Sequence, residues 1–167
     1  MSTNQFGVVS IVGVGLIGAS LGLALKGAGV VREVIGVGRS SANLDQAKKM
    51  GAIDRVADLA EAVQSSQWIV LCVPVAQMRA IFTQLEPHLG SNTLITDAGS
   101  TKSDVILAAK EVLGKKVCQF VPAHPIAGGA QHGAAAARAG AGRSPRGLAP
   151  EPARRCAELF HDQHPSR

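Results

Sequence analysis

The sequence has no tyrosine, a single tryptophan and only three cysteines among its 167 residues. Cys72, Cys118 and Cys156 are odd in number and widely spaced, a pattern typical of reduced thiols in the cytoplasm rather than of a disulfide framework. The first six residues are mostly polar and no long apolar run follows, so neither a secretory signal nor a membrane span is predicted. These absences favour a cytoplasmic protein.

The net charge of +5 raises the question of a nucleic-acid partner. Up to Gly133 the chain holds 11 basic and 9 acidic residues, whereas the remainder holds six arginines, three acids and no lysine. No basic stripe alternates with aromatic residues, as it does in many nucleic-acid-binding surfaces. The charge distribution therefore argues against binding to nucleic acid.

A glycine pattern follows directly after an apolar, β-branched run at residues 8–12, and a helix-like spacing of leucines follows the glycines. In a Gly-x-Gly-x-x-Gly turn the first glycine permits the tight turn, the second leaves room for a pyrophosphate, and the third lets the helix pack against the strand. The free N–H groups of that helix face the phosphates. We expect the turn to bind a dinucleotide through Gly13, Gly15, Leu16, Ile17 and Gly18; the alternative is a glycine-rich turn without a ligand.

Strand-like and helix-like segments alternate along the first 133 residues. After the first strand, further strands are predicted at residues 33–37, 53–56, 68–73, 93–96 and 116–121. Helices are predicted from the glycine turn to residues 27–29, then at 42–50, 59–64, 75–85 and 103–113. Because each strand is apolar on both faces, the pattern indicates a parallel sheet covered on two sides. We therefore expect an α/β fold, a doubly wound Rossmann-type domain over residues 1–133.

The composition changes from Ala134 onward. The last valine is Val121 and the last isoleucine is Ile126, while four of the eight prolines follow Ala141. A segment so rich in Ala, Gly, Arg and Pro cannot bury enough apolar area to offset its ordering entropy. Residues 134–167 are predicted to form a disordered tail. A second hypothesis is a shifted reading frame, because GC-rich DNA read out of frame encodes these four residues.

In a doubly wound sheet the ligand lies beyond the carboxyl ends of the strands. Val73 ends the apolar strand predicted at residues 68–73, Pro74 follows it, and Asp97 follows the strand at 93–96, so these three residues are candidate cofactor contacts.

The segment after the second strand bears on which cofactor is bound. Domains that prefer NAD usually carry an acid about 20 residues past the glycine turn, whereas this chain has Gly38 there, followed by Arg39 and Ser40. The missing carboxylate and the added cation suit a 2′-phosphate, which favours NADP over NAD. Two alternatives for Arg39 are a solvated loop residue and a residue stacked on the adenine of either cofactor.

Two further segments carry side chains that suit catalysis. Ser100 precedes Thr101 and Asp104, which have the spacing of a helix-capping box, so both a capping and a catalytic role are open. His124 stands between two prolines at the mouth of the last strand, where an imidazole could accept a proton near neutral pH. A structural role for His124 is the alternative. No metal site is expected, because His132 has no other obvious ligands near it.

Taken together, three segments resemble the prephenate/arogenate (cyclohexadienyl) dehydrogenases: residues 13–26, residues 97–102 and residues 124–128. The likeness covers residues 8–133. It implies NAD(P)-dependent oxidative decarboxylation of prephenate or arogenate in tyrosine biosynthesis. By the same resemblance His124 takes the proton of the ring hydroxyl, and Ser100 hydrogen-bonds both that hydroxyl and His124.

Two departures from the family pattern affect the expected function. The family usually has an acid two residues after the glycine of its His-Pro-x-x-Gly motif, where this chain has Ala130. Family members also carry a C-terminal helical domain that dimerises and binds substrate, and nothing in this sequence resembles it. We therefore expect the chain to bind the cofactor, to turn over substrate poorly and to lack the family's dimer contact. The alternatives are a non-catalytic dinucleotide-binding module and another Rossmann dehydrogenase, such as a β-hydroxyacid dehydrogenase.

Overall fold

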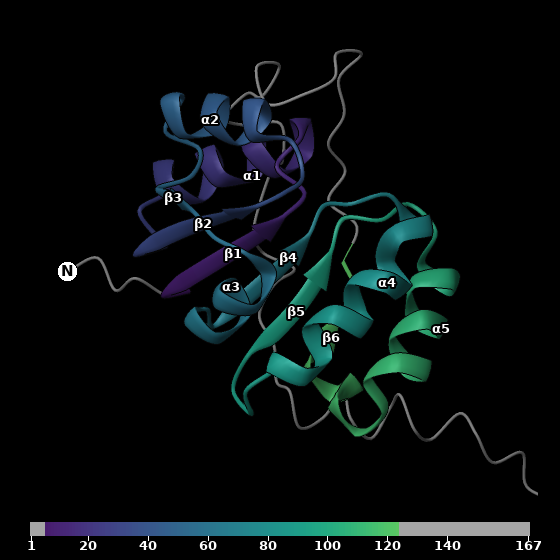
Figure 1. The fold of residues 1–167 in the computed structure, drawn as a ribbon. Helices are drawn as coiled ribbons and strands as arrows, with labels where there is room; N and C mark the ends of the chain where they lie inside the picture. Colours follow the sequence, from purple (N-terminus) through teal and green to yellow (C-terminus); the bar gives the residue numbers. More distant parts are fainter. Residues whose placement is uncertain (1–5, 124–167) are drawn as a thin grey trace, which may run out of the picture.

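A computed structural model describes residues 6–123; His124 and the predicted tail at 134–167 lie outside the described residues. One sheet of six parallel strands forms the centre of the described part, in the order β3-β2-β1-β4-β5-β6 (Figure 1). The strands are β1 (Val8–Val12), β2 (Glu33–Val37), β3 (Arg55–Val56), β4 (Trp68–Leu71), β5 (Leu94–Asp97) and β6 (Phe120–Val121).

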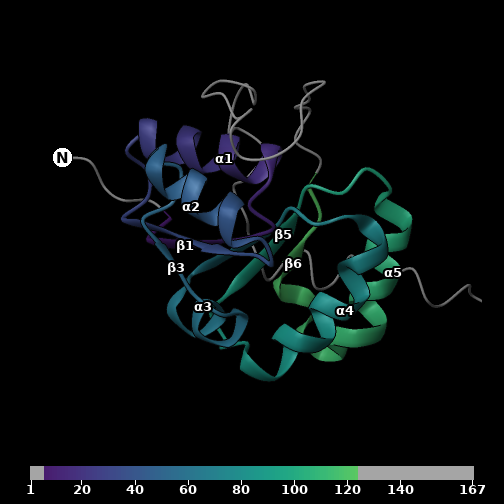
Figure 2. The same ribbon diagram turned by 45° about the horizontal axis from the view of Figure 1, so that its top comes forward.

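Helices cover both faces of the sheet. The connecting helices are α1 (Leu16–Gly27), α2 (Ser41–Lys49), α3 (Leu59–Ser65), α4 (Val75–Leu85) and α5 (Lys102–Leu113), with short 3₁₀ helices η1 (Glu86–His88) and η2 (Gly114–Gln119). Figure 2 shows α1 and α2 on one face and α3, α4 and α5 on the other. This is the predicted doubly wound, Rossmann-type fold. Within residues 6–123, every helix is too short or too polar to cross a membrane.

The central strand β1 is buried along its whole length. Its residues alternate between two apolar clusters: Val9 and Ile11 pack on the α1 side, and Val12 packs on the α4 side. On the α4 side the cluster includes Leu71 and Phe82, both fully buried. Because both faces of the strand are buried, both must be covered by helices, and this explains the three-layer arrangement.

Side chains cap the N-termini of α2 and α3, whereas the capping box expected at α5 is absent. The Ser40 hydroxyl accepts a hydrogen bond from the Asn43 N–H at the start of α2, and the Asp58 carboxylate accepts one from the Glu61 N–H at the start of α3. Thr101 stands at the N-cap of α5, but its side chain makes no capping hydrogen bond. The Thr101–Asp104 capping box is therefore not formed.

The last predicted strand is shorter than expected. Residues 114–119 form the 3₁₀ helix η2, and only Phe120 and Val121 pair with β5. The reason is that the Gln119 side chain, rather than the backbone, meets the start of β5: its Nε2 atom donates to the carbonyls of Gly90 and Thr93 at 2.6 and 2.8 Å. Strand β5 ends one residue later than predicted, which places Asp97 inside the sheet.

Thr96 offers a test of the packing at this end of the sheet. Its side chain is 4% exposed, and its Oγ1 atom has no hydrogen-bond partner among the described residues. Burial of an unpaired hydroxyl costs about 1–3 kcal/mol. We expect Thr96→Val, which keeps the branched shape and removes the hydroxyl, to raise the free energy of unfolding by about 1 kcal/mol. Urea denaturation followed by circular dichroism measures this change, and a lower midpoint would contradict it.

Candidate functional site

The turn between β1 and α1 is closed by backbone on two sides. Gly13 has a φ of +93°, and a Cβ atom there would lie 2.6 Å from the Cys72 carbonyl oxygen. A Cβ atom on Gly18 would lie 2.4 Å from the Gly13 carbonyl oxygen and 2.9 Å from Ile11 Cγ2. Real Cβ atoms do not approach backbone this closely, so both positions require glycine. The roles predicted for the first and third glycines, a tight turn and close helix packing, are confirmed.

The middle glycine of the turn lies in open space. A Cβ atom on Gly15 would meet no other atom within 4 Å, and its φ of −98° with ψ of −153° is extended backbone that any residue adopts. Gly15 is the N-cap of α1, and no side chain caps that helix. The first N–H groups of α1, starting at Leu16 and Ile17, are thus left for a ligand, and the helix dipole favours an anion there.

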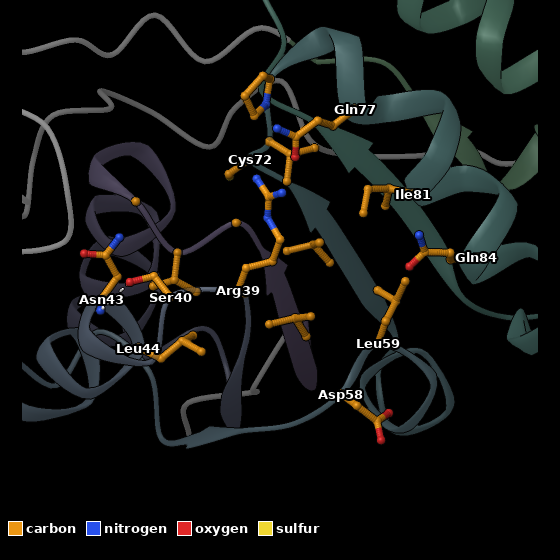
Figure 3. A pocket seen from close by; sticks show the side chains of 18 of the residues that line it. Arg39, Ser40, Asn43, Leu44, Asp58, Leu59, Cys72, Gln77, Ile81 and Gln84 are labelled. Atoms are coloured by element: carbon orange, nitrogen blue, oxygen red, sulfur yellow. Dashed lines mark hydrogen bonds between the residues drawn. The ribbon is translucent and has the colours of Figure 1, made fainter.

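A pocket of about 690 Å³ opens beside this turn at the carboxyl edge of the sheet (Figure 3). Six residues expected to contact a cofactor line it: Gly13, Gly15, Arg39, Ser40, Val73 and Pro74. Four others expected to do so are not among its lining residues: Leu16, Ile17, Gly18 and Asp97.

The opposite wall of the pocket was not predicted from the sequence. It is formed by one side of α4, through Gln77, Ala80, Ile81 and Gln84. Their spacing of three, four and seven residues is the signal that could have identified this wall. Met78 and Phe82 on the same helix are fully buried in the core, whereas Ile81 packs against that core and is partly exposed at the pocket.

The loop after β2 supplies a cation and a hydroxyl to the pocket. Figure 3 shows the Arg39 side chain reaching between Ser40 on one side and Gln77 on the other. Arg39 makes no ion pair within the described part of the chain. The Ser40 oxygen accepts from the Asn43 N–H at 3.3 Å, which leaves its own O–H able to donate. The carboxylate of Asp58 caps α3 and points away from Arg39.

Cys72 lines the pocket next to the glycine turn, and its thiol is free. Burial, and secondarily the charge of Asp97, raise the pKa of the Cys72 thiol to about 12. The thiol is therefore neutral at physiological pH. The expectation of reduced thiols is met at Cys72 and is wrong at Cys118, which is disulfide-bonded.

Backbone hydrogen bonds just beyond the strands join the turns along this edge. The Gly13 N–H donates to the Val37 carbonyl at 2.8 Å, and the Cys72 N–H donates to the Val12 carbonyl at 2.7 Å. The Ala98 N–H donates to the Leu71 carbonyl at 2.9 Å. The turns after β1, β4 and β5 are thus held in one row.

The loop after β5 brings the candidate Ser100 to the same edge as the glycine turn, and its side chain is exposed. The candidate base His124 follows Ala123 in the chain and lies outside the described residues. Within residues 6–123, no group of three or more His, Cys, Asp or Glu side chains is placed to hold a metal ion.

Comparisons with known proteins identify the family. The sequence-family model for the nucleotide-binding domain of prephenate dehydrogenase matches residues 21–142. The chain is 35% identical over 130 residues to a prephenate dehydrogenase of Lactococcus lactis, and 37% identical over 133 residues to that of Bacillus subtilis. These matches cover 77% and 78% of this chain but 36% and 35% of the relatives, so the chain spans about a third of their length.

A solved structure agrees with these matches. The crystal structure of prephenate dehydrogenase from Aquifex aeolicus superposes with a TM-score of 0.70 at 30% identity. The superposition covers 77% of this chain and 46% of that chain. The family expected from the three sequence segments is confirmed: the chain belongs to the prephenate dehydrogenase family and carries its nucleotide-binding domain.

Proposed function

We propose that the chain binds a nicotinamide dinucleotide in the pocket beside the glycine turn, with its pyrophosphate on the first N–H groups of α1. The observation that carries this proposal is the contrast among the three glycines. Gly13 and Gly18 are closed in by backbone, whereas Gly15 faces open space beside an uncapped helix N-terminus. That space is the one into which a pyrophosphate could come close to bare backbone.

We further propose that NADP is preferred over NAD. Arg39 reaches into the pocket and makes no ion pair within residues 6–123, and the next residue, Ser40, also lines the pocket. Gly38 replaces the acid that would repel a 2′-phosphate. A guanidinium and a hydroxyl from adjacent residues that line one pocket suit the two charges and the acceptor oxygens of that phosphate.

The proposed reaction is the oxidative decarboxylation of prephenate or arogenate. When bound, the nicotinamide supplies the hydride acceptor. His124 would take the proton of the ring hydroxyl, Ser100 would hydrogen-bond that hydroxyl, and the ring carboxylate would leave as CO₂ as the ring becomes aromatic. The exposed position of Ser100 at the carboxyl edge, and the arrival of the chain at Ala123 on that edge, support these roles.

The first prediction tests the pyrophosphate site. Gly15→Ala adds a methyl group in open space, so the protein should fold, but the methyl group enters the proposed pyrophosphate site. We expect the Kd of NADPH, measured by fluorescence titration, to rise about tenfold or more, which corresponds to about 1.4 kcal/mol. Gly27→Ala is the matched control, because Gly27 lies at the other end of α1 and is equally unobstructed. Equal affinities in the two variants would refute the site.

The second prediction tests the coenzyme preference. Arg39→Ala removes the proposed partner of the 2′-phosphate, and charged hydrogen bonds contribute about 1.5–3 kcal/mol. The Kd of NADPH should therefore rise about 10- to 100-fold while that of NADH stays within about twofold. Arg32→Ala, an exposed arginine outside the pocket-lining residues, is the control. A parallel loss of both coenzymes would favour adenine stacking by Arg39 instead.

The third prediction concerns turnover. We expect the 167-residue chain to oxidise prephenate and arogenate well below the rates of typical enzymes, about 1–1000 per second, because Ala130 replaces the acid that the family resemblance implies. Steady-state assays with each substrate and each coenzyme measure this. A kcat within the usual range would contradict the expectation of impairment and leave the proposed reaction standing.

A further inference from the structure

Asp97 is a buried acid that the proposed reaction does not use directly. It is the last residue of β5, and only 1% of its surface is exposed. A buried carboxyl group is costly unless its oxygens are hydrogen-bonded, so the groups that satisfy it are held firmly in place.

The two carboxyl oxygens of Asp97 hold two different loops. Oδ2 accepts a hydrogen bond from the Gly99 N–H at 2.8 Å, and Oδ1 accepts one from the Ala123 N–H at 3.3 Å. Gly99 immediately precedes Ser100 in the chain, and Ala123 immediately precedes His124. One side chain thus fixes the backbone next to each of the two candidate catalytic residues.

The neighbouring residues fit this arrangement. A Cβ atom on Gly99 would lie 2.9 Å from Asp97 Oδ2 and 3.2 Å from Val75 Cγ2, so the close approach of that loop depends on glycine. The pairing of β5 with β6 ends at Thr96 and Val121, and the bond from the Ala123 N–H to Asp97 extends the connection two residues further. The chain is therefore tied to β5 up to the residue before His124.

We infer that Asp97 is a positioning residue, which fixes the backbone at Gly99 and Ala123, the residues that precede Ser100 and His124 in the chain. This inference rests on the proposed function for the roles of those two residues. It also replaces direct cofactor contact as the role of Asp97, because the side chain is buried and both of its oxygens are bonded to backbone within its own domain.

Backbone amide exchange in the full-length chain, measured by NMR, tests the inference without requiring activity. Asp97→Asn keeps the side-chain volume but replaces one acceptor with an amide group, and Asp97→Ala removes both acceptors. We expect amide exchange at Gly99 and Ala123 to become at least tenfold faster in Asp97→Ala and to change less in Asp97→Asn. Exchange at Gly13 and Cys72, which bond to other strands, should stay unchanged. Unchanged protection at Gly99 and Ala123 would overturn the inference.

Kinetics supply the second measurement. Misplacement of a catalytic group by about 1 Å costs about 100-fold in rate, so kcat with prephenate should fall about 10- to 100-fold in Asp97→Asn, with the Kd of NADPH within twofold of the parent chain. Thr96→Val, a substitution of the adjacent buried residue, should leave kcat unchanged. A variant with weaker NADPH binding and an unchanged kcat at saturation would instead favour direct cofactor contact.

The exchange and kinetic measurements distinguish a failure of the proposed function from a failure of the positioning role of Asp97. A parent chain that binds neither coenzyme and turns over neither substrate refutes the proposed function, whereas the exchange rates at Gly99 and Ala123 still decide whether Asp97 holds both loops. Should Asp97→Ala fail to fold, Asp97→Asn carries the comparison, because it retains the volume and one acceptor oxygen.

Discussion

The site depends on close backbone-to-backbone packing at two glycines, Gly13 and Gly18, where no side chain lies between the segments. The turn after β1 lies against the carbonyl of Cys72, and α1 lies against the carbonyl of Gly13, at separations that leave no room for a Cβ atom. Any side chain at Gly13 or Gly18 would push the helix away from the sheet. The N-terminus of α1 would then no longer lie at the edge of the sheet, and the pocket would lose the wall formed by the glycine turn.

The row of hydrogen bonds beyond the strands extends this constraint across the sheet. Each of the bonds from Gly13, Cys72 and Ala98 ties the start of one turn to the end of the neighbouring strand. Because the turns are joined in this way, one row of backbone hydrogen bonds links the position of the glycine turn to that of the Ser100 loop. Parallel strands make this possible, since all their carboxyl ends lie at the same edge.

Much of this could be predicted from the sequence, and the failures have physical causes. Apolar runs and glycine stops located most elements, because both signals are local. The length of strand β6 was overestimated because the Gln119 side chain reaches carbonyls almost thirty residues away, a contact with no local signature. The pocket wall on α4 was missed because Ile81 packs on the core and lines the pocket at once, and hydrophobic periodicity assigns a residue to one face only.

The N-termini of α1 and α5 differ in the charged groups around them, and this difference determines which of them favours an anion. At α1 the first turn contains no acid and no side chain caps the helix, so its N–H groups and dipole remain available to phosphates. At α5 the first turn carries Asp104, and the buried Asp97 already binds the Gly99 N–H ahead of the helix. Negative charge beside that second N-terminus opposes a phosphate there. Of the two helix N-termini, that of α1 is therefore the more favourable place for the proposed pyrophosphate.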